Sequence, residues 1–555
     1  MKNIKIIEIK KLLTKKNFEG ATLFIENAYT ETEKTSEILN ILGVCKLQKK
    51  LSNNFDLISA IEDFRNCYLK EKKTKQGIEG LTNFIVCSNK IQQYEDSIKY
   101  FKEAEKSFGY IQKLFNLMVD VYKNFNNVRG SIHCLKKIIE NENIKNCKSA
   151  FQRYIYFNNF INHWSQKDFF ENSIKIEHTL PQFLEQKKID TIKNKKIKLA
   201  FLSSDIRKNH SVTGFLKTVV SNVNKDKFEL IFFSNCKIEK EDMTTEDFKI
   251  FFDKWVNINN LNDNEAINVI KKNKLDIIID LMGPTSSNRM SLFKNRIAPI
   301  QILWLGYNNT SGLKEMDYFI ADPHLIEKKE VKFYSEKILF LPSIWNCHSG
   351  FSTSRKEIPS PLIKNKYITF GSFNNINKIS DEVIDVWSKI LKKTKNSRLI
   401  LKSSRVFSHS SLMKKFKKNK VLDLITIMDT KNNFEDHMEE YKKIDIALDT
   451  FPYNGVTTSF EAIWMGAPLL TLNGFNANSR AGVSINKNIN MNYFIANNKD
   501  EYILKAIELS NNSKKVNDAR KYLFNNTLES NLFNTKKFSK EFFETLANIN
   551  SNYIS

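Results

Sequence analysis

Apolar residues recur at helical spacing through the first third of the chain, and no proline occurs before Pro181. This pattern predicts helices. Three segments within it share one arrangement of small, apolar, any, any and apolar residues, and they are spaced by 37 and 34 residues: 60–64 (AIEDF), 97–101 (SIKYF) and 131–135 (SIHCL). A tetratricopeptide unit is a helix-turn-helix of about 34 residues, and Leu42-Gly43 stands where such a unit has its Leu-Gly pair. Residues 1–167 are therefore predicted to form tetratricopeptide-like repeats, with a plain helical bundle as the alternative.

Stacked helical pairs build a concave surface. We expect this surface to dock a protein or peptide partner, unless the helices serve only as a scaffold that caps the next domain. Residues 168–196 are predicted to form a linker.

The pattern then changes to short apolar runs separated by helical stretches. Such alternation predicts parallel sheets. It occurs twice, which predicts two Rossmann-like domains, 197–360 and 361–555, that bind ligands at the carboxyl ends of their strands. The expected strands are 197–202, 228–233, 275–281, 300–305, 367–370, 397–402, 444–448 and 468–472.

Composition narrows the function classes. The formal net charge is +24, but the lysines are spread along the whole chain among many Asn and Ile residues, so a nucleic-acid partner is not favoured. The seven cysteines form no CxxC pair, which predicts reduced thiols rather than a zinc cluster. A secretory signal and an apolar run of about 20 residues are both missing, so a soluble, cytoplasmic chain without a membrane partner is expected. Neither a strand-end DxD nor GxGxxG is found, so no metal site and no bound cofactor are predicted.

One segment carries the strongest chemical signal. Residues 448–461 (LDTFPYNGVTTSFE) predict a strand, a turn and a helix that begins at about Thr458. The N-terminus of a helix has free N–H groups and a positive dipole end, which suit a diphosphate. Thr457 and Thr458 can add hydroxyl donors, and Glu461, on a nearby helical face, can accept hydrogen bonds from ribose hydroxyls. The alternative is ordinary N-capping by threonine with a glutamate in the first turn.

This segment, with 464–468 (WMGAP) and 479–484 (SRAGVS), resembles the nucleotide-sugar half of the protein O-GlcNAc transferase and SPINDLY glycosyltransferase family. Further segments resemble the family in the same order along the chain, from about residue 197 to 545: 203–205 with 210–212, 296–301 with 304–307 and 310–312, and 371–375 with Lys378. The resemblance implies a GT-B-type fold of two Rossmann-like domains. It also implies an enzyme that transfers a sugar from a nucleotide donor, with inversion and without a metal, to a protein Ser/Thr hydroxyl.

The resemblance also assigns residues. Lys378 is expected to contact the donor diphosphate, and His210 to accept the acceptor's proton or to position the substrate. Asn375 and His437 are expected in the nucleotide-binding pocket, together with Thr457, Thr458 and Glu461. Asn375 and Arg480 are weaker candidates, since both residues can be structural.

The donor and the activity are left with alternatives. UDP-N-acetylglucosamine is the first choice of donor. The DTFPY run at 449–453 and the loop at 210–212 also resemble SPINDLY, which would imply GDP-fucose. Three places depart from the family pattern: 283–285 (GPT), 308–309 (NN) and Val456. They lie near the expected sugar and acceptor sites, so a helical-repeat scaffold with an inactive catalytic half is the alternative to an enzyme.

Overall fold

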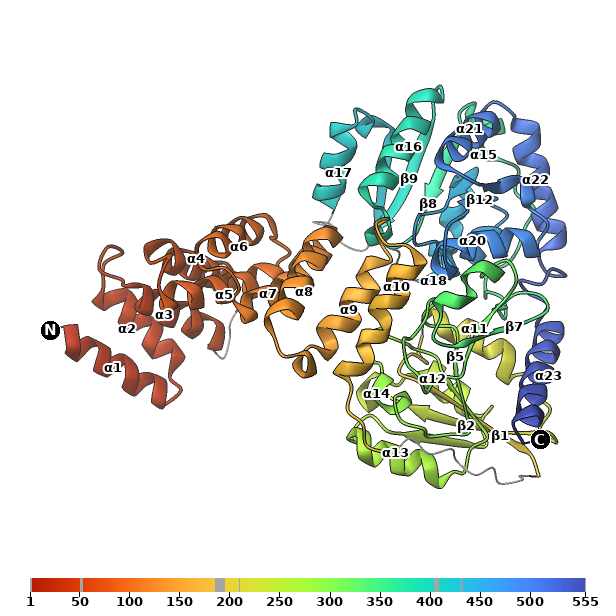
Figure 1. Cartoon of the computed structure of the whole chain (residues 1–555). Coiled ribbons are helices and arrows are strands. Elements are labelled where there is room, and N and C mark those ends of the chain that lie inside the picture. Colours follow the sequence, from red (N-terminus) through yellow and green to blue (C-terminus); the bar gives the residue numbers. More distant parts are fainter. Residues whose placement is uncertain are drawn as a thin grey trace. The chain divides into compact units, whose positions relative to one another are not determined.

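A computed structural model describes residues 2–49, 53–184, 195–208, 210–403, 409–429, 431 and 433–554. The chain divides into two compact units, Met1–Glu142 and Asn143–Ser555 (Figure 1). Across the described residues, every helix is too short or too polar to span a lipid bilayer.

The first unit is built of helices that pack on their neighbours in sequence (Figure 1). Residues Ala60, Ser97 and Ser131, the small positions of the predicted repeat, lie in α4, α6 and α8 and are all fully buried. Each therefore sits where the second helix of a pair packs on its neighbours. The described helices are α1 (Lys2–Thr14), α2 (Phe18–Ala28), α3 (Ser36–Gln48), α4 (Asn54–Lys70), α5 (Lys75–Lys90), α6 (Glu95–Phe108), α7 (Gln112–Asn124) and α8 (Val128–Asn141).

Gly43 shows why a small residue is needed at a helix crossing. A Cβ at this position of α3 would meet the Phe64 ring at 2.6 Å, and Phe64 on α4 is fully buried. The glycine lets the two helices approach closely enough for the ring to fill the space between them. The prediction of helical repeats is confirmed.

The second unit contains a seven-stranded parallel sheet with the order β3-β2-β1-β4-β5-β6-β7. Its central strands are apolar along their whole length because helices cover both faces of a parallel sheet; β4, for example, is buried at all four positions. The strands are β1 (Ile197–Ser203), β2 (Phe228–Ser234), β3 (Lys254–Asn257), β4 (Ile277–Asp280), β5 (Ile300–Leu303), β6 (Tyr318–Ala321) and β7 (Lys337–Phe340). Helices α11 (Ser211–Val220), α12 (Met243–Lys249), α13 (Asp263–Lys272) and α14 (Met290–Phe293) connect them.

A second parallel sheet follows, with the order β10-β9-β8-β11-β12-β13. Its strands are β8 (Thr369–Ser372), β9 (Arg398–Ser403), β10 (Ile425–Asp429), β11 (Ile446–Leu448), β12 (Leu469–Leu472) and β13 (Ile495–Ala496). Its helices are α15 (Pro361–Asn365), α16 (Asp381–Lys393), α17 (His409–Lys418), α18 (Phe434–Glu439), α19 (Thr457–Trp464), α20 (Ala477–Asn488), α21 (Lys499–Ser510) and α22 (Ser513–Asn526). The two Rossmann-like domains are confirmed.

The strand order reverses at one place in each sheet, beside β1 and β4 in the first and beside β8 and β11 in the second. Such switch points open a crevice at the carboxyl ends of the strands, where ligands of these sheets bind. The second crevice is formed by the loops after β8 and β11, which contain Lys378 and the 448–461 segment.

The domain limits differ from those expected. Helices α9 (Lys148–Asn158) and α10 (Gln166–Ser173), expected in the repeat region and at its end, belong to the second unit. They are held there by side-chain hydrogen bonds, such as Gln152 Nε2 to Asn288 Oδ1 at 3.3 Å and Asn159 Nδ2 to Tyr307 OH at 3.3 Å. The expected linker begins inside α10 and continues as a 3-10 helix, η2 (Ile174–Thr179), while residues 185–194 of it lie outside the described residues.

The C-terminal helix α23 (Thr535–Ile554) also differs from its expected place in the second Rossmann-like domain. It packs on the first sheet's domain, where the ring centres of Phe228 and Phe543, and of Trp304 and Phe542, are each 4.8 Å apart (Figure 1). The chain therefore ends by joining its last helix to the first domain.

Candidate active site

Lys378 lies at the end of a short 3-10 helix, η5 (Ile376–Lys378), that follows β8. Its ammonium donates to the Asn454 carbonyl at 2.7 Å and lies 4.1 Å from the centre of the Tyr453 ring. Burial lowers the pKa of Lys378 to about 8, although the nearby carboxylate of Asp449 favours the charged form. A cation is thus held in the crevice before any ligand arrives.

Asp449 organises the loop opposite Lys378. Its Oδ1 accepts the N–H groups of Thr450 at 2.9 Å and Gly455 at 2.8 Å, and its Oδ2 accepts the Thr471 hydroxyl at 2.8 Å. Burial raises the pKa of Asp449 to about 6, against the effect of these donors and of Lys378. The loop from 449 to 455 is therefore tied at both ends to one buried carboxyl group.

Helix α19 begins at Thr457 and has no hydrogen bond from a capping side chain at its N-terminus. The Thr458 hydroxyl instead donates to Asn374 Oδ1 at 2.8 Å, across the switch point. A Cβ on Gly455 would meet Thr458 Oγ1 at 2.5 Å, so glycine is needed for this close approach. Threonine capping, the alternative expected from the sequence, is not what the structure has. The positive end of α19 faces the same crevice as Lys378, an arrangement that suits a diphosphate.

His437 and Glu461 are brought together although they are 24 residues apart in sequence. His437 on α18 lies with Nε2 3.0 Å from Glu461 Oε2, and the Tyr441 hydroxyl donates to the same oxygen at 2.9 Å. Lys402, at the carboxyl end of β9, contacts His437 Nδ1 with its ammonium. The sequence interpretation missed Lys402, because a lysine near the end of a strand is an ordinary feature.

The two weaker candidates lie in different settings. Asn375 is exposed at the start of η5, and its side chain accepts the Asn377 N–H at 3.0 Å, beside Lys378. Arg480 is only 1% exposed, pairs with Glu330 and donates to the Gly474 carbonyl at 3.0 Å. It ties α20 to the first domain and does not share the crevice residues' contacts, so its place is structural.

His210 lies after β1, at the switch point of the first sheet. Its Nδ1 accepts the Val212 N–H at 3.4 Å, a long hydrogen bond that caps α11, and its Nε2 lies 3.6 Å from Asp205 Oδ1. Burial lowers the pKa of His210, while Asp205 favours the charged form. The ring is therefore kept neutral near pH 7, which a proton acceptor requires.

Asp280, the last residue of β4, is a candidate that the sequence interpretation missed. Its oxygens accept the N–H groups of Met282 at 2.9 Å and Gly283 at 3.1 Å. Burial raises the pKa of Asp280 to about 7, and the negative charge of Asp205 adds to this effect. A carboxyl group with such a pKa at a switch point is a candidate acid or base. The available signal was its place at the end of the apolar run 275–281.

The family departures at 308–309 are supported by a neighbouring helix. Asn309 Oδ1 accepts a hydrogen bond from Gln166 Nε2 of α10 at 2.8 Å and another from the Thr310 N–H at 2.8 Å. Asn308 is also buried. This loop is therefore an ordered part of the second unit.

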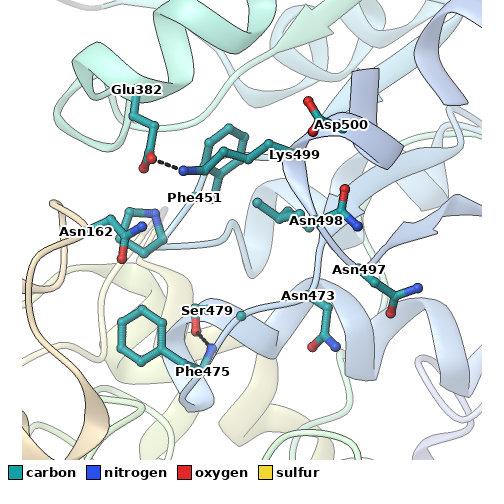
Figure 2. A pocket seen from close by; sticks show the side chains of 13 residues that line it. Asn162, Glu382, Phe451, Asn473, Phe475, Ser479, Asn497, Asn498, Lys499 and Asp500 are labelled. Atoms are coloured by element: carbon teal, nitrogen blue, oxygen red, sulfur yellow. Dashed lines mark hydrogen bonds and ion pairs between the residues drawn. The ribbon is translucent and has the colours of Figure 1, made fainter. Parts of the chain in front are cut away.

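A cavity of about 420 Å³ lies on the other side of the 449–455 loop, at the carboxyl ends of β11, β12 and β13 (Figure 2). Phe451 and Phe475 form apolar parts of its wall, and Lys499 and Glu382 pair at its rim. It is lined by Asn162, Glu382, Phe451, Pro452, Leu472, Asn473, Gly474, Phe475, Ser479, Asn497, Asn498, Lys499 and Asp500. None of the predicted site residues is among them, so the cavity and the crevice around Lys378 are separate.

Comparison with known proteins agrees with this geometry. The SPINDLY protein of Solanum lycopersicum, named a probable UDP-N-acetylglucosamine–peptide N-acetylglucosaminyltransferase, is 31% identical over 347 residues, which are 60% of this chain and 36% of that protein. The SEC protein of Arabidopsis thaliana, with the same enzyme name, is 26% identical over 363 residues, or 62% and 36% of the two chains. The chain spans about a third of the length of these curated relatives.

A solved structure of an O-GlcNAc transferase mutant from Thermobaculum terrenum matches with a TM-score of 0.78 at 21% identity, over 95% of this chain and 99% of that chain. This likeness confirms the helical and GT-B-type fold. The sequence also matches the model of glycosyl transferase family 41 over residues 169–351 and 346–542, which together include both Rossmann-like domains. The chain therefore belongs to glycosyl transferase family 41.

Proposed function

We propose that the chain transfers a sugar from a nucleotide donor to a Ser/Thr hydroxyl of a protein, with inversion and without a metal ion. The observation that carries this proposal is the crevice itself, where the Lys378 ammonium and the uncapped N-terminus of α19 meet. A fixed cation and free N–H groups can take up the charge of a departing diphosphate, which is the role a metal fills elsewhere.

In the proposed reaction the acceptor oxygen attacks the anomeric carbon from the face opposite the diphosphate. The bond from the anomeric carbon to the diphosphate oxygen breaks, and its electron pair leaves with the diphosphate toward Lys378 and α19. The hydroxyl proton passes to His210, whose neutral ring can accept it once the long bond from Val212 is released. Asp280, with a pKa of about 7, is the alternative acceptor for this proton.

UDP-N-acetylglucosamine is the proposed donor. The names of the SPINDLY and SEC relatives support it. GDP-fucose is the alternative, supported by the likeness of residues 449–453 to SPINDLY. The Thr458 hydroxyl and the first turn of α19 would bind the diphosphate of either donor, and Glu461 would accept the ribose hydroxyls. The helical repeats would dock the protein acceptor.

The test is thermal unfolding of the purified chain with UDP, GDP, UDP-N-acetylglucosamine or GDP-fucose, beside the Lys378→Ala variant. We expect one nucleotide family to raise the unfolding temperature of the wild type and to have a smaller effect on the variant. The responding base identifies the donor. If no nucleotide at a concentration far above a typical donor affinity has an effect, the enzyme proposal fails and the scaffold alternative is preferred.

A further inference from the structure

Lys402 is a largely buried lysine, only 8% exposed, whose ammonium contacts a ring nitrogen of another buried group. An ammonium offers hydrogen-bond donors only, so His437 Nδ1 must be the acceptor. In a neutral imidazole the single ring proton is then on Nε2, which faces Glu461 Oε2 at 3.0 Å. The lysine thereby selects one tautomer of the histidine.

The consequence reaches Glu461, which is 5% exposed. Both donors, His437 Nε2 and the Tyr441 hydroxyl, use the same carboxylate oxygen, Oε2. Among the described hydrogen bonds, this leaves Oε1 as the oxygen available to a ligand. Lys402, His437 and Glu461 come from β9, α18 and α19, so three elements converge on the orientation of one carboxylate.

We propose that Lys402 is a positioning residue of the nucleotide pocket, which holds His437 in its Nε2–H tautomer and thereby fixes the Glu461 carboxylate for the ribose of the donor. This inference rests on the proposed function, and it adds a residue for which the sequence gave no signal. Lys402 does not itself touch the ligand in this scheme.

The charges around Lys402 support this assignment. Burial lowers the pKa of Lys402, whereas Glu461 and Glu440 favour its charged form and Lys431 opposes it. Glu440 pairs with Lys431 at 3.3 Å and with Lys443 at 2.6 Å, which leaves Glu461 as the counter-charge that Lys402 shares through the histidine. A positive charge on one side of His437 and a negative charge on the other keep the ring neutral and polarised.

Removal of the ammonium changes what protons do at this site. Without Lys402, Nδ1 of His437 is free to bind a proton, and the imidazolium then supplies the positive charge beside Glu461. We therefore expect the loss to depend on pH in the range where histidine titrates. A purely structural role of Lys402 would give the same loss at every pH.

The experiment measures the affinity of the full chain for UDP and for GDP by calorimetry at pH 7.5 and pH 6.0. Relative to wild type at the same pH, Lys402→Met should bind the preferred nucleotide about tenfold more weakly at pH 7.5 and within about threefold at pH 6.0. The ratio to wild type removes the titration of the nucleotide phosphate. Lys402→Met combined with His437→Gln should stay weak at both pH values.

Two further variants keep the outcome clear. Lys505→Met is the matched control, since Lys505 of the same domain donates to the carbonyls of Tyr493 and Ile495 and contacts no ring nitrogen; it should bind as wild type does. Lys402→Arg keeps a donor for Nδ1 and should remain within about threefold of wild type at both pH values. It carries the test if the methionine variant fails to fold.

The inference is overturned if Lys402→Met binds as wild type does at pH 7.5, or if its loss is the same at pH 6.0. A tenfold loss in Lys402→Arg at both pH values would also overturn it. If wild type itself binds neither UDP nor GDP, the proposed function fails first, and this inference with it. The two failures are therefore distinguished by the wild-type measurement.

Discussion

The two parallel sheets place the same kinds of residue at their switch points, yet in different states. An aspartate follows or ends the later strand in each: Asp280 on β4 and Asp449 after β11, both fully buried and both accepting backbone N–H groups. Asp449 has the cation Lys378 nearby, whereas Asp280 has the like charge of Asp205. Burial raises both pKa values, to about 6 and about 7.

The helices after the switch points differ in the same sense. In the first sheet the N-terminus of α11 is capped by His210, whose Nδ1 accepts the Val212 N–H. In the second sheet the N-terminus of α19 has no capping side chain, and Lys378 lies beside it. One topology therefore provides two crevices, of which the second is arranged for an anion and the first for a neutral group that exchanges a proton.

The largest effect should separate the two crevices by function. Lys378→Met should lower the transfer rate about 10²–10³-fold, the cost of removing one preorganised donor for developing negative charge, and should weaken nucleotide binding. His210→Ala should also slow transfer but keep nucleotide affinity within about threefold. Single-turnover transfer and calorimetry measure the two quantities. Loss of nucleotide affinity in the histidine variant, or its retention in the lysine variant, would remove the distinction between the crevices.

The paired aspartates offer a second contrast. In Asp280→Asn an amide NH₂ must face the N–H of Met282 or Gly283, which should lower the free energy of unfolding by about 1–3 kcal/mol while nucleotide affinity stays the same. In Asp449→Asn the Thr471 hydroxyl can turn to accept from the amide, so the fold should suffer less. Lys378 would lose its neighbouring negative charge, and nucleotide affinity should fall. Chemical denaturation and calorimetry of both variants test this exchange of effects; equal stability losses would contradict it.

Most of the fold was predictable because helices and parallel strands have different apolar periods. The strands that the sequence prediction omitted include those at the sheet edges, β3, β7, β10 and β13. Three of these, β3, β7 and β10, are only partly buried, so they lack the continuous apolar run of the central strands. The place of α23 was also unpredictable, because nothing local in a sequence states which sheet a terminal helix covers.

The site shows the same limit at the level of single residues. Thr457, Thr458 and Glu461 belong to one continuous segment whose loop and helix start were expected within a residue. Lys402 and His437 are 35 residues apart and meet only because β9 and α18 are adjacent in the folded domain. Asp280 reads from the sequence as one polar residue at a strand end; its raised pKa comes from burial.

A third effect follows from the pKa of Lys378, about 8 in the unliganded chain. Below pH 8 the lysine carries the charge that a diphosphate needs. Above pH 8 binding must first add a proton, so affinity should fall up to about tenfold per pH unit until the pKa of the bound state is reached. Calorimetry from pH 7 to 9.5, in buffers of different ionisation enthalpy, should show proton uptake on binding. Constant affinity across this range would place the cation outside the anion's reach.

The smallest effect compares two threonines of the same shape change. Thr458 donates to Asn374 across the second switch point, and Thr213 donates to the Arg207 carbonyl at 3.1 Å beside the first. Thr458→Val removes a hydroxyl from the anion crevice and should weaken nucleotide binding about threefold to tenfold, the worth of one hydrogen bond. Thr213→Val removes an equivalent hydroxyl outside that crevice and should leave nucleotide affinity unchanged. Equal losses in the two variants would mean that the nucleotide spans both switch points, because only a ligand that reaches the first crevice can sense Thr213.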